Sequence, residues 1–202
     1  AFVEQVFIRV GFFTTNKLIA SLGTVDFATH QICMNLVNMS FAFGDGLGIA
    51  SSALVGQNLG AKRADIATIY GKSLQRISLS IGVVFIFVFV AGKTVLVSLF
   101  TNDVNVIQAA SSIMVLIALT SPIMTTNVVV SGSLRGAGDT KFVAYTSFVS
   151  IGLVRPGATW LFCYPLGLGL IGAWVAYSLD QCLRFAINYA RFLKGDWTKI
   201  KI

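Results

Sequence analysis

Residues 41–63 read FAFGDGLGIASSALVGQNLGAKR and place one carboxylate among three glycines inside an apolar stretch. Asp45 lies between Gly44 and Gly46, and Gly48 follows two residues later. In a membrane span an ionisable group costs about 3 kcal/mol on insertion scales, so such a group usually serves a function. Glycines in a span allow two helix backbones to approach closely. The interpretation of this stretch therefore depends on whether the chain lies in a membrane.

The composition is typical of a membrane protein. Of the 202 residues, 55% are hydrophobic and only 11% are charged, and the mean hydropathy is +0.80. In a soluble domain about a quarter of all residues are charged. The interval 104–134 contains 31 residues without a charge, which exceeds the ~20 residues that a helix needs to cross a bilayer. These values argue against a soluble enzyme or binding domain.

Charged residues and glycines divide the chain into six apolar segments, each long enough to cross a membrane as a helix. The sequence therefore predicts an all-α membrane protein whose approximate spans are 1–22, 25–57, 68–98, 104–134, 142–163 and 168–192. The chain begins at Ala1, and no signal peptide precedes the first apolar segment. We expect it to be part of a longer protein.

The basic residues predict the orientation, because Lys and Arg near short loops stay on the cytoplasmic side. Only Lys17 and Lys93 lie near the loops of one side. Ten basic residues lie near the loops of the other side or near the C-terminus, namely Lys62, Arg63, Lys72, Arg76, Arg135, Lys141, Arg191, Lys194, Lys199 and Lys201. The sequence thus predicts a multi-pass protein of the cell membrane with both termini in the cytoplasm. The net charge of +7 reflects this topology, and a nucleic-acid partner is not expected.

The second segment has a polar face. Gln31, Asn35, Asn38 and Asp45 are spaced by four, three and seven residues, so on a helix they fall within a stripe about 80° wide. In lipid such a face must turn toward protein or water. It therefore lines a central cavity, or else its amides join neighbouring helices. His30 lies off this stripe, and we expect it to be a hydrogen-bonded interface residue.

Three further charged residues lie in the fifth and sixth segments. Asp180 and Arg184 are four residues apart, so they are expected to form a structural ion pair. Arg155 is also deep, and Asp45 is one carboxylate that it could pair with. The glycine pairs 56–60 and 132–136 have the spacing of helix-packing motifs. The three cysteines lie in apolar surroundings without the spacing of a metal site, and we expect neither a metal nor a cofactor.

Four segments together resemble the multidrug and toxic compound extrusion (MATE) family. They are FVEQ (2–5), GTVDFATHQI (23–32), LVGQNLGAK (54–62) and LRGAGDT (134–140). The family has twelve helices in two six-helix lobes, and this chain is similar to the second, C-terminal lobe. The resemblance implies an exporter that exchanges Na⁺ or H⁺ for small drug-like compounds, which are often cationic or amphipathic. Its partners would be the lipid bilayer and the N-terminal lobe of the same chain.

Within this scheme the sequence offers candidates for ion coupling and for the substrate cavity. Asp45 and Glu4 each lie about 30 Å along a helix from the turn at Gly23, so their carboxylates are expected at one level. We predict that these two residues and Asn127 couple the ion. The predicted substrate cavity comprises Gln31, Asn35, Asn38 and Met124. Two alternatives are a flippase for lipid-linked precursors, which would need more basic residues in its cavity, and a half-size membrane interaction protein that does not transport.

Overall fold

The chain folds into six long helical rods, as the sequence predicts. In the computed structural model the described backbone covers residues 2–200, and side chains are described except at 2–5, 7, 8 and 199. The rods are α1 (Phe2–Ala20), α2 (Thr24–Gly60), α3 (Ala64–Ser98), α4 (Val104–Gly136), the consecutive pieces α5 (Thr140–Ser147), η1 (Phe148–Val154) and α6 (Arg155–Cys163), and α7 (Gly169–Lys194). A short 3₁₀ turn, η2 (Asp196–Lys199), follows. No strand occurs in this described part of the chain.

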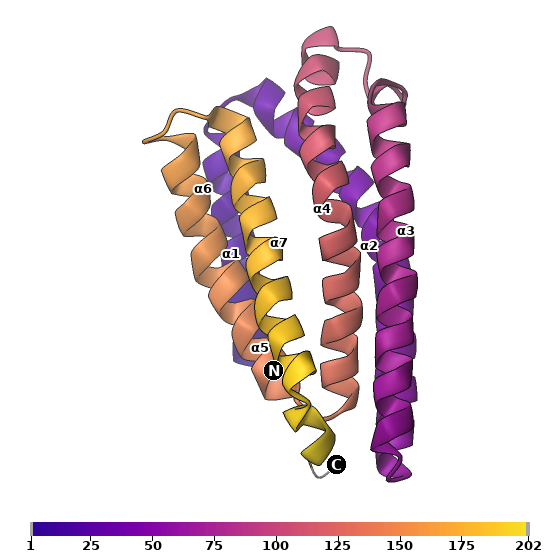
Figure 1. Cartoon of the computed structure of the whole chain (residues 1–202). Helices are drawn as coiled ribbons and strands as arrows, with labels where there is room; N and C mark the ends of the chain where they lie inside the picture. Colours follow the sequence, from indigo (N-terminus) through magenta and orange to yellow (C-terminus); the bar gives the residue numbers. More distant parts are fainter. Residues whose placement is uncertain (1, 201–202) are drawn as a thin grey trace.

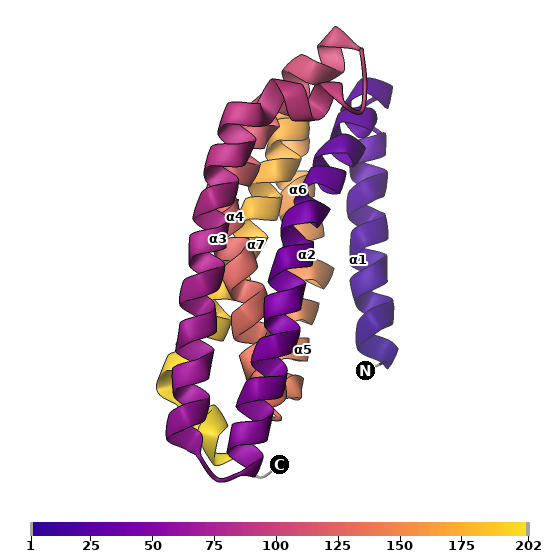
Figure 2. The ribbon, with the colours of Figure 1, turned by 90° about the vertical axis from the view of Figure 1, so that its right-hand side faces the viewer.

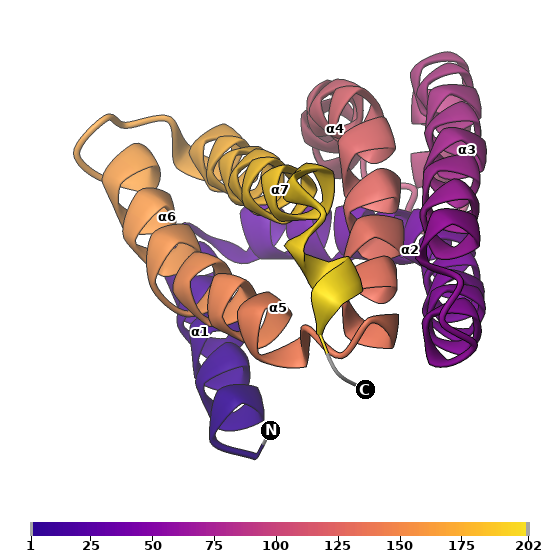
Figure 3. The same cartoon turned by 60° about the horizontal axis from the view of Figure 1, so that its bottom comes forward.

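The rods form two groups, α2 to α4 and α1 with α5 to α7. The two groups contact each other mainly through α4 and α7. α2 and α3 pack against α4, whereas α1 packs against η1 and α6, and α6 packs against α7 (Figures 1 and 2). Figure 3 shows α7 lying between α6 and α4. The α2–α3 turn, the α4–α5 turn and the described C-terminal end all lie at the lower end of Figure 1. The basic loops therefore share one end of the molecule.

Among the described residues, three helices have the length and apolarity needed to cross a membrane: α2, α3 and α4. α3 is the most apolar of the three, yet only 17% of its most apolar stretch is buried. In α4 the corresponding buried share is 61%. α4 is thus the central helix, and α3 presents an apolar surface outward, as a lipid-facing helix does.

Small residues allow α2 and α4 to pack backbone against backbone. A Cβ atom at Gly132 would collide with the carbonyl oxygen of Gly48, and one at Gly136 with that of Ser52. One at Gly56 would lie 2.9 Å from the carbonyl oxygen of Gly136. The expected packing role is therefore confirmed for these glycines. It does not hold for Gly60, where a Cβ atom would meet nothing within 4 Å.

Two helix features differ from the sequence expectation. α3 begins at Ala64 rather than 68, because Asp65 in its first turn is favourable at a helix N-terminus and need not lie outside the helix. The expected single span 142–163 contains a π-helical stretch between α5 and α6. Pro156 follows this stretch and has no N–H to donate to the preceding turn, which favours the irregular hydrogen bonding there.

Candidate functional site

A cavity of about 150 Å³ lies between α1, α2, α6 and α7. α1 and α2 share a short turn, but the cavity separates them further along, since residues of both helices line its walls. Its polar wall comes from α2, and its aromatic wall comes from α1 and α7. Its lining includes Phe12, Gln31, Asn35, Asn38, Arg155 and Trp174.

The amide face of α2 forms one wall of this cavity. Gln31, Asn35 and Asn38 all line it, and all three side chains are exposed in this six-helix unit. Their spacing places them on successive turns of one helix face. The structure therefore brings these three predicted cavity residues together. Amides can donate and accept hydrogen bonds, so this wall suits polar groups of varied geometry.

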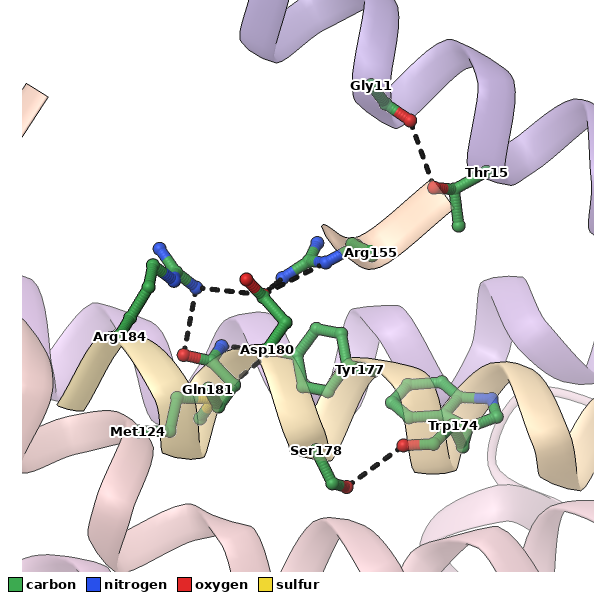
Figure 4. A network of polar contacts seen from close by, with 10 residues as sticks. All are labelled: Gly11, Thr15, Met124, Arg155, Trp174, Tyr177, Ser178, Asp180, Gln181 and Arg184. Atoms are coloured by element: carbon green, nitrogen blue, oxygen red, sulfur yellow. Dashed lines mark hydrogen bonds and ion pairs between the residues drawn. The ribbon is translucent and has the colours of Figure 1, made fainter. Parts of the chain in front are cut away.

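Arg155 supplies the positive charge of the cavity and is almost fully buried, with 3% of its surface exposed. Its guanidinium lies over the Phe12 ring at 5.1 Å and over the Tyr177 ring at 4.7 Å from the centroids. Its Nε donates to Asp180 Oδ2 at 3.1 Å, and its Nη2 forms a further ion pair with the same oxygen (Figure 4). A buried arginine needs a carboxylate, and Asp180 provides it.

Asp180 accepts from two arginines. The predicted pair with Arg184 is present at 3.4 Å, and Arg184 also donates to Gln181 Oε1 at 2.9 Å. The alternative in which Asp45 pairs with Arg155 is wrong, because Asp180 occupies that position. A sequence signal was available: α6 and α7 form a hairpin, and Arg155 and Asp180 lie about 12 Å and 17 Å along their helices from its turn.

Asp45 lies in a separate groove between α2 and α4. Its side chain is exposed, and the groove is also lined by Gly48, Ser52, Gly132 and Arg135. No ion pair or hydrogen bond involves the Asp45 carboxylate within the described part of the chain. The Asp45 carboxylate therefore has no direct partner there, and Arg135 is the basic residue that shares its groove.

The remaining predicted residues lie in different surroundings. Asn127 is buried between α4 and α7, where its Oδ1 accepts from Asn188 Nδ2 at 3.1 Å. Met124 does not line the cavity: it lies in the core, 1% exposed, and accepts from the Tyr177 hydroxyl at 3.3 Å. Its position on α4 behind α7 explains this, because the Tyr177 ring lies on the cavity side. The side chain of Glu4 lies outside the described residues.

His30 and Trp174 are cavity residues that sequence reasoning did not assign. The centroids of the two rings are 5.4 Å apart. His30 Nδ1 has no hydrogen-bond partner within the described structure, and neither has Trp174 Nε1. The expectation of a hydrogen-bonded histidine is therefore wrong for this nitrogen. Both ring nitrogens belong to residues that line the cavity, so a bound molecule could supply the missing partner.

Long apolar helices around a cavity with one polar wall are features of a membrane transport protein. The chain belongs to the MatE family, whose family model matches residues 1–161. The members of this family are transporters and not enzymes. The resemblance seen in the sequence is thereby confirmed.

The chain is similar to several multidrug resistance proteins. It is 31% identical over 207 residues to the probable multidrug resistance protein NorM of Pasteurella multocida, covering 94% of this chain and 42% of that protein. It is 26% identical over 197 residues to the uncharacterized transporter YisQ of Bacillus subtilis, covering 96% and 43%. The chain thus spans about two fifths of the length of these curated relatives.

The same fold occurs in solved structures. One is the outward-facing conformation of a multidrug resistance MATE family transporter of the MOP superfamily, with a TM-score of 0.84 at 21% identity over 99% of this chain and 45% of that chain. An inward-facing conformation matches with a TM-score of 0.85 at 20% identity, covering 91% and 42%. One lobe of such a transporter therefore accounts for nearly the whole chain.

Proposed function

We propose that this chain is one six-helix lobe of a cation-coupled antiporter that exports drug-like, often cationic or amphipathic compounds by alternating access. The coupling ion is Na⁺ or H⁺. The family and the names of the relatives support export of small molecules. In this proposal the substrate is held between this lobe and the N-terminal six-helix lobe of a longer chain.

The exposed amide face of α2 carries the proposal. Gln31, Asn35 and Asn38 are exposed although they lie in one of the three helices suited to cross a membrane. Facing lipid, three unpaired amides would be costly. A second lobe that covers this face encloses a shared chamber, in which the amides and the aromatic wall contact a substrate of varied shape.

The proposed coupling is a competition between ion and substrate. Asp45, with Glu4 and Asn127 as further contributors, binds the cation or proton, and its occupancy disfavours the substrate-bound state. The coupling free energy is then the difference in ion-binding free energy between the inward-facing and the outward-facing state. Asp45 suits this role because its carboxylate is exposed and has no direct partner among the described residues.

The proposed orientation places the α2–α3 and α4–α5 turns in the cytoplasm, with both termini. It is supported by the basic loops at one end of the molecule (Figure 1). Single substitutions Lys62→Cys, Lys141→Cys and Asp103→Cys in a cysteine-free background test it with a membrane-impermeant thiol reagent. The first two are expected to react only from the cytoplasmic side and the third only from outside. The reverse pattern would refute the orientation.

The two-lobe proposal is tested by drug resistance in a host that lacks its own exporters. The longer protein containing this lobe should confer resistance and drive ion-dependent efflux. The 202-residue chain alone should insert into the membrane without conferring resistance, because one lobe cannot close around a substrate. Resistance from the 202-residue chain alone would show that it works as a homodimer, and the two-lobe proposal would be wrong.

A further inference from the structure

A second hollow, distinct from the polar cavity, lies between α3 and α7 with α4 beneath it. Its volume is about 390 Å³. We call it the lateral groove; its lining includes Lys72, Gln75, Arg76, Thr126, Phe185 and Tyr189. No part of the proposed transport mechanism uses it.

The mouth of the lateral groove is positively charged. Lys72 and Arg76 lie one helical turn apart on α3, and both side chains are exposed. Neither forms an ion pair with any described residue. The acids near the end of α7 are already engaged, since Arg191 binds Asp139 at 2.8 Å and Asp196 at 3.5 Å. An anion in the groove would therefore meet two cations without a competing carboxylate.

The floor of the lateral groove contains two buried polar groups without partners. Gln75 is 7% exposed and Thr126 is 6% exposed. Gln75 Nε2 and Thr126 Oγ1 make no hydrogen bond within the described structure. Buried donors of this kind are normally satisfied by protein, water or a ligand. Both can donate to an acceptor oxygen placed in the groove.

The α7 wall of the lateral groove is aromatic. The rings of Phe185 and Tyr189 are stacked, with centroids 5.2 Å apart and an interplanar angle of 18°. Leu193 extends this wall, and Leu79 adds an apolar side chain from α3; both are at least half exposed. The groove therefore combines cations, buried hydrogen-bond donors and an apolar wall, which together match an amphiphile with an anionic head.

If α3 is centred in the bilayer, the Lys72 end of the groove lies near the boundary of the hydrocarbon layer. α3 has 35 residues and is about 52 Å long, whereas the hydrocarbon core is ~30 Å thick, so about 11 Å projects at each end of a centred helix. Lys72 lies about 12 Å from the first residue of α3. The uncharged run 77–92 begins directly after Arg76.

We propose that the lateral groove binds an anionic phospholipid from the leaflet on the side of the basic loops. The phosphate contacts Lys72 and Arg76, and ester oxygens accept from Gln75 Nε2 and Thr126 Oγ1. One acyl chain lies against Phe185 and Tyr189. Basic pockets between transmembrane helices bind anionic lipid head groups on this electrostatic principle.

The test uses the delipidated longer protein that contains this lobe, in a neutral detergent. Thermal unfolding is measured while dioleoylphosphatidylglycerol or dioleoylphosphatidylcholine is added. The phosphatidylglycerol should raise the melting temperature of the protein at lower concentrations than the phosphatidylcholine. The double substitution Lys72→Gln with Arg76→Gln should weaken the phosphatidylglycerol effect about 30-fold, from the contribution expected of two basic residues.

The matched control is Lys62→Gln with Arg63→Gln, which removes two exposed cations at the same end of the molecule but outside the groove. This control should keep the wild-type affinity, and an equal loss in it would overturn the proposal. Equal stabilisation by both lipids would also overturn it, as would full stabilisation by glycerol 3-phosphate alone. Gln75→Leu provides a second arm if the double variant does not fold. It should raise stability without lipid and weaken phosphatidylglycerol binding, and unchanged binding would contradict the proposal.

Discussion

Asp45 and Asp180 are both carboxylates in the middle of long helices, yet they differ in burial and in their partners. Asp180 is fully buried and accepts from Arg155 and Arg184, which lie on two helices. Asp45 is exposed in a groove and has no ion pair among the described residues. A buried carboxylate between two arginines holds helices together. An exposed and unpaired carboxylate contributes little to folding, and in the proposed mechanism Asp45 binds the ion.

The glycines around Asp45 sharpen this contrast. Gly44 and Gly48 face α4 and allow close packing, whereas a Cβ atom at Gly46 would meet nothing within 4 Å. The stretch that contains Asp45 thus has one face fixed against α4 and one face open. Asp45 is part of a rigid helix, but its side chain lies outside the tight contact.

The largest effect is expected from Asp180→Asn. It leaves the buried Arg155 and the partly buried Arg184 without a carboxylate, and removing one partner of a buried ion pair costs about 3–5 kcal/mol. Thermal unfolding in detergent, or the yield of folded protein, measures the loss. Adding Arg155→Met should recover part of it, because one of the two unpaired charges is then removed. An unchanged melting temperature for Asp180→Asn would show that the Asp180 cluster does not hold α6 to α7.

A smaller effect is expected from Gly132→Ala. The new methyl group would collide with the Gly48 carbonyl oxygen, and overpacking of this kind costs about 1–3 kcal/mol. Gly46→Ala is the matched control, since its methyl group enters open space and alanine favours a helix by ~1 kcal/mol over glycine. The melting temperature should fall for the first and hold or rise for the second. Equal behaviour of the two variants would refute the close α2–α4 contact.

The sequence predicted the helical framework because charges and glycines mark the ends of apolar spans. It also predicted the amide wall of the cavity, since Gln31, Asn35 and Asn38 follow helical spacing. The π-helical stretch before Arg155 was not predicted, because a proline shows that hydrogen bonding must change but not how the helix compensates.

The pairing of charged residues was predicted less well. Asp180 with Arg184 follows from spacing along one helix, whereas Arg155 with Asp180 depends on how α6 and α7 pack. Met124 was expected in the cavity and lies in the core. The flexible thioether side chain of Met124 suits a cavity wall as well as a core, so only the position of α7 decides where it lies. No sequence pattern indicates the lateral groove, because its residues come from three separate helices.

The most direct test of the coupling role compares Asp45→Asn with Asp65→Asn in the longer protein that contains this lobe. Asp65 is an exposed carboxylate in the first turn of α3 and lines neither the polar cavity, nor the Asp45 groove, nor the lateral groove. Efflux of a fluorescent cation is measured in vesicles under a Na⁺ gradient and under a H⁺ gradient, with protein level and substrate binding as controls. Asp45→Asn should abolish the ion-driven efflux while protein level and binding persist, and Asp65→Asn should leave all three unchanged. Undiminished efflux by Asp45→Asn would contradict the proposal that Asp45 couples the ion.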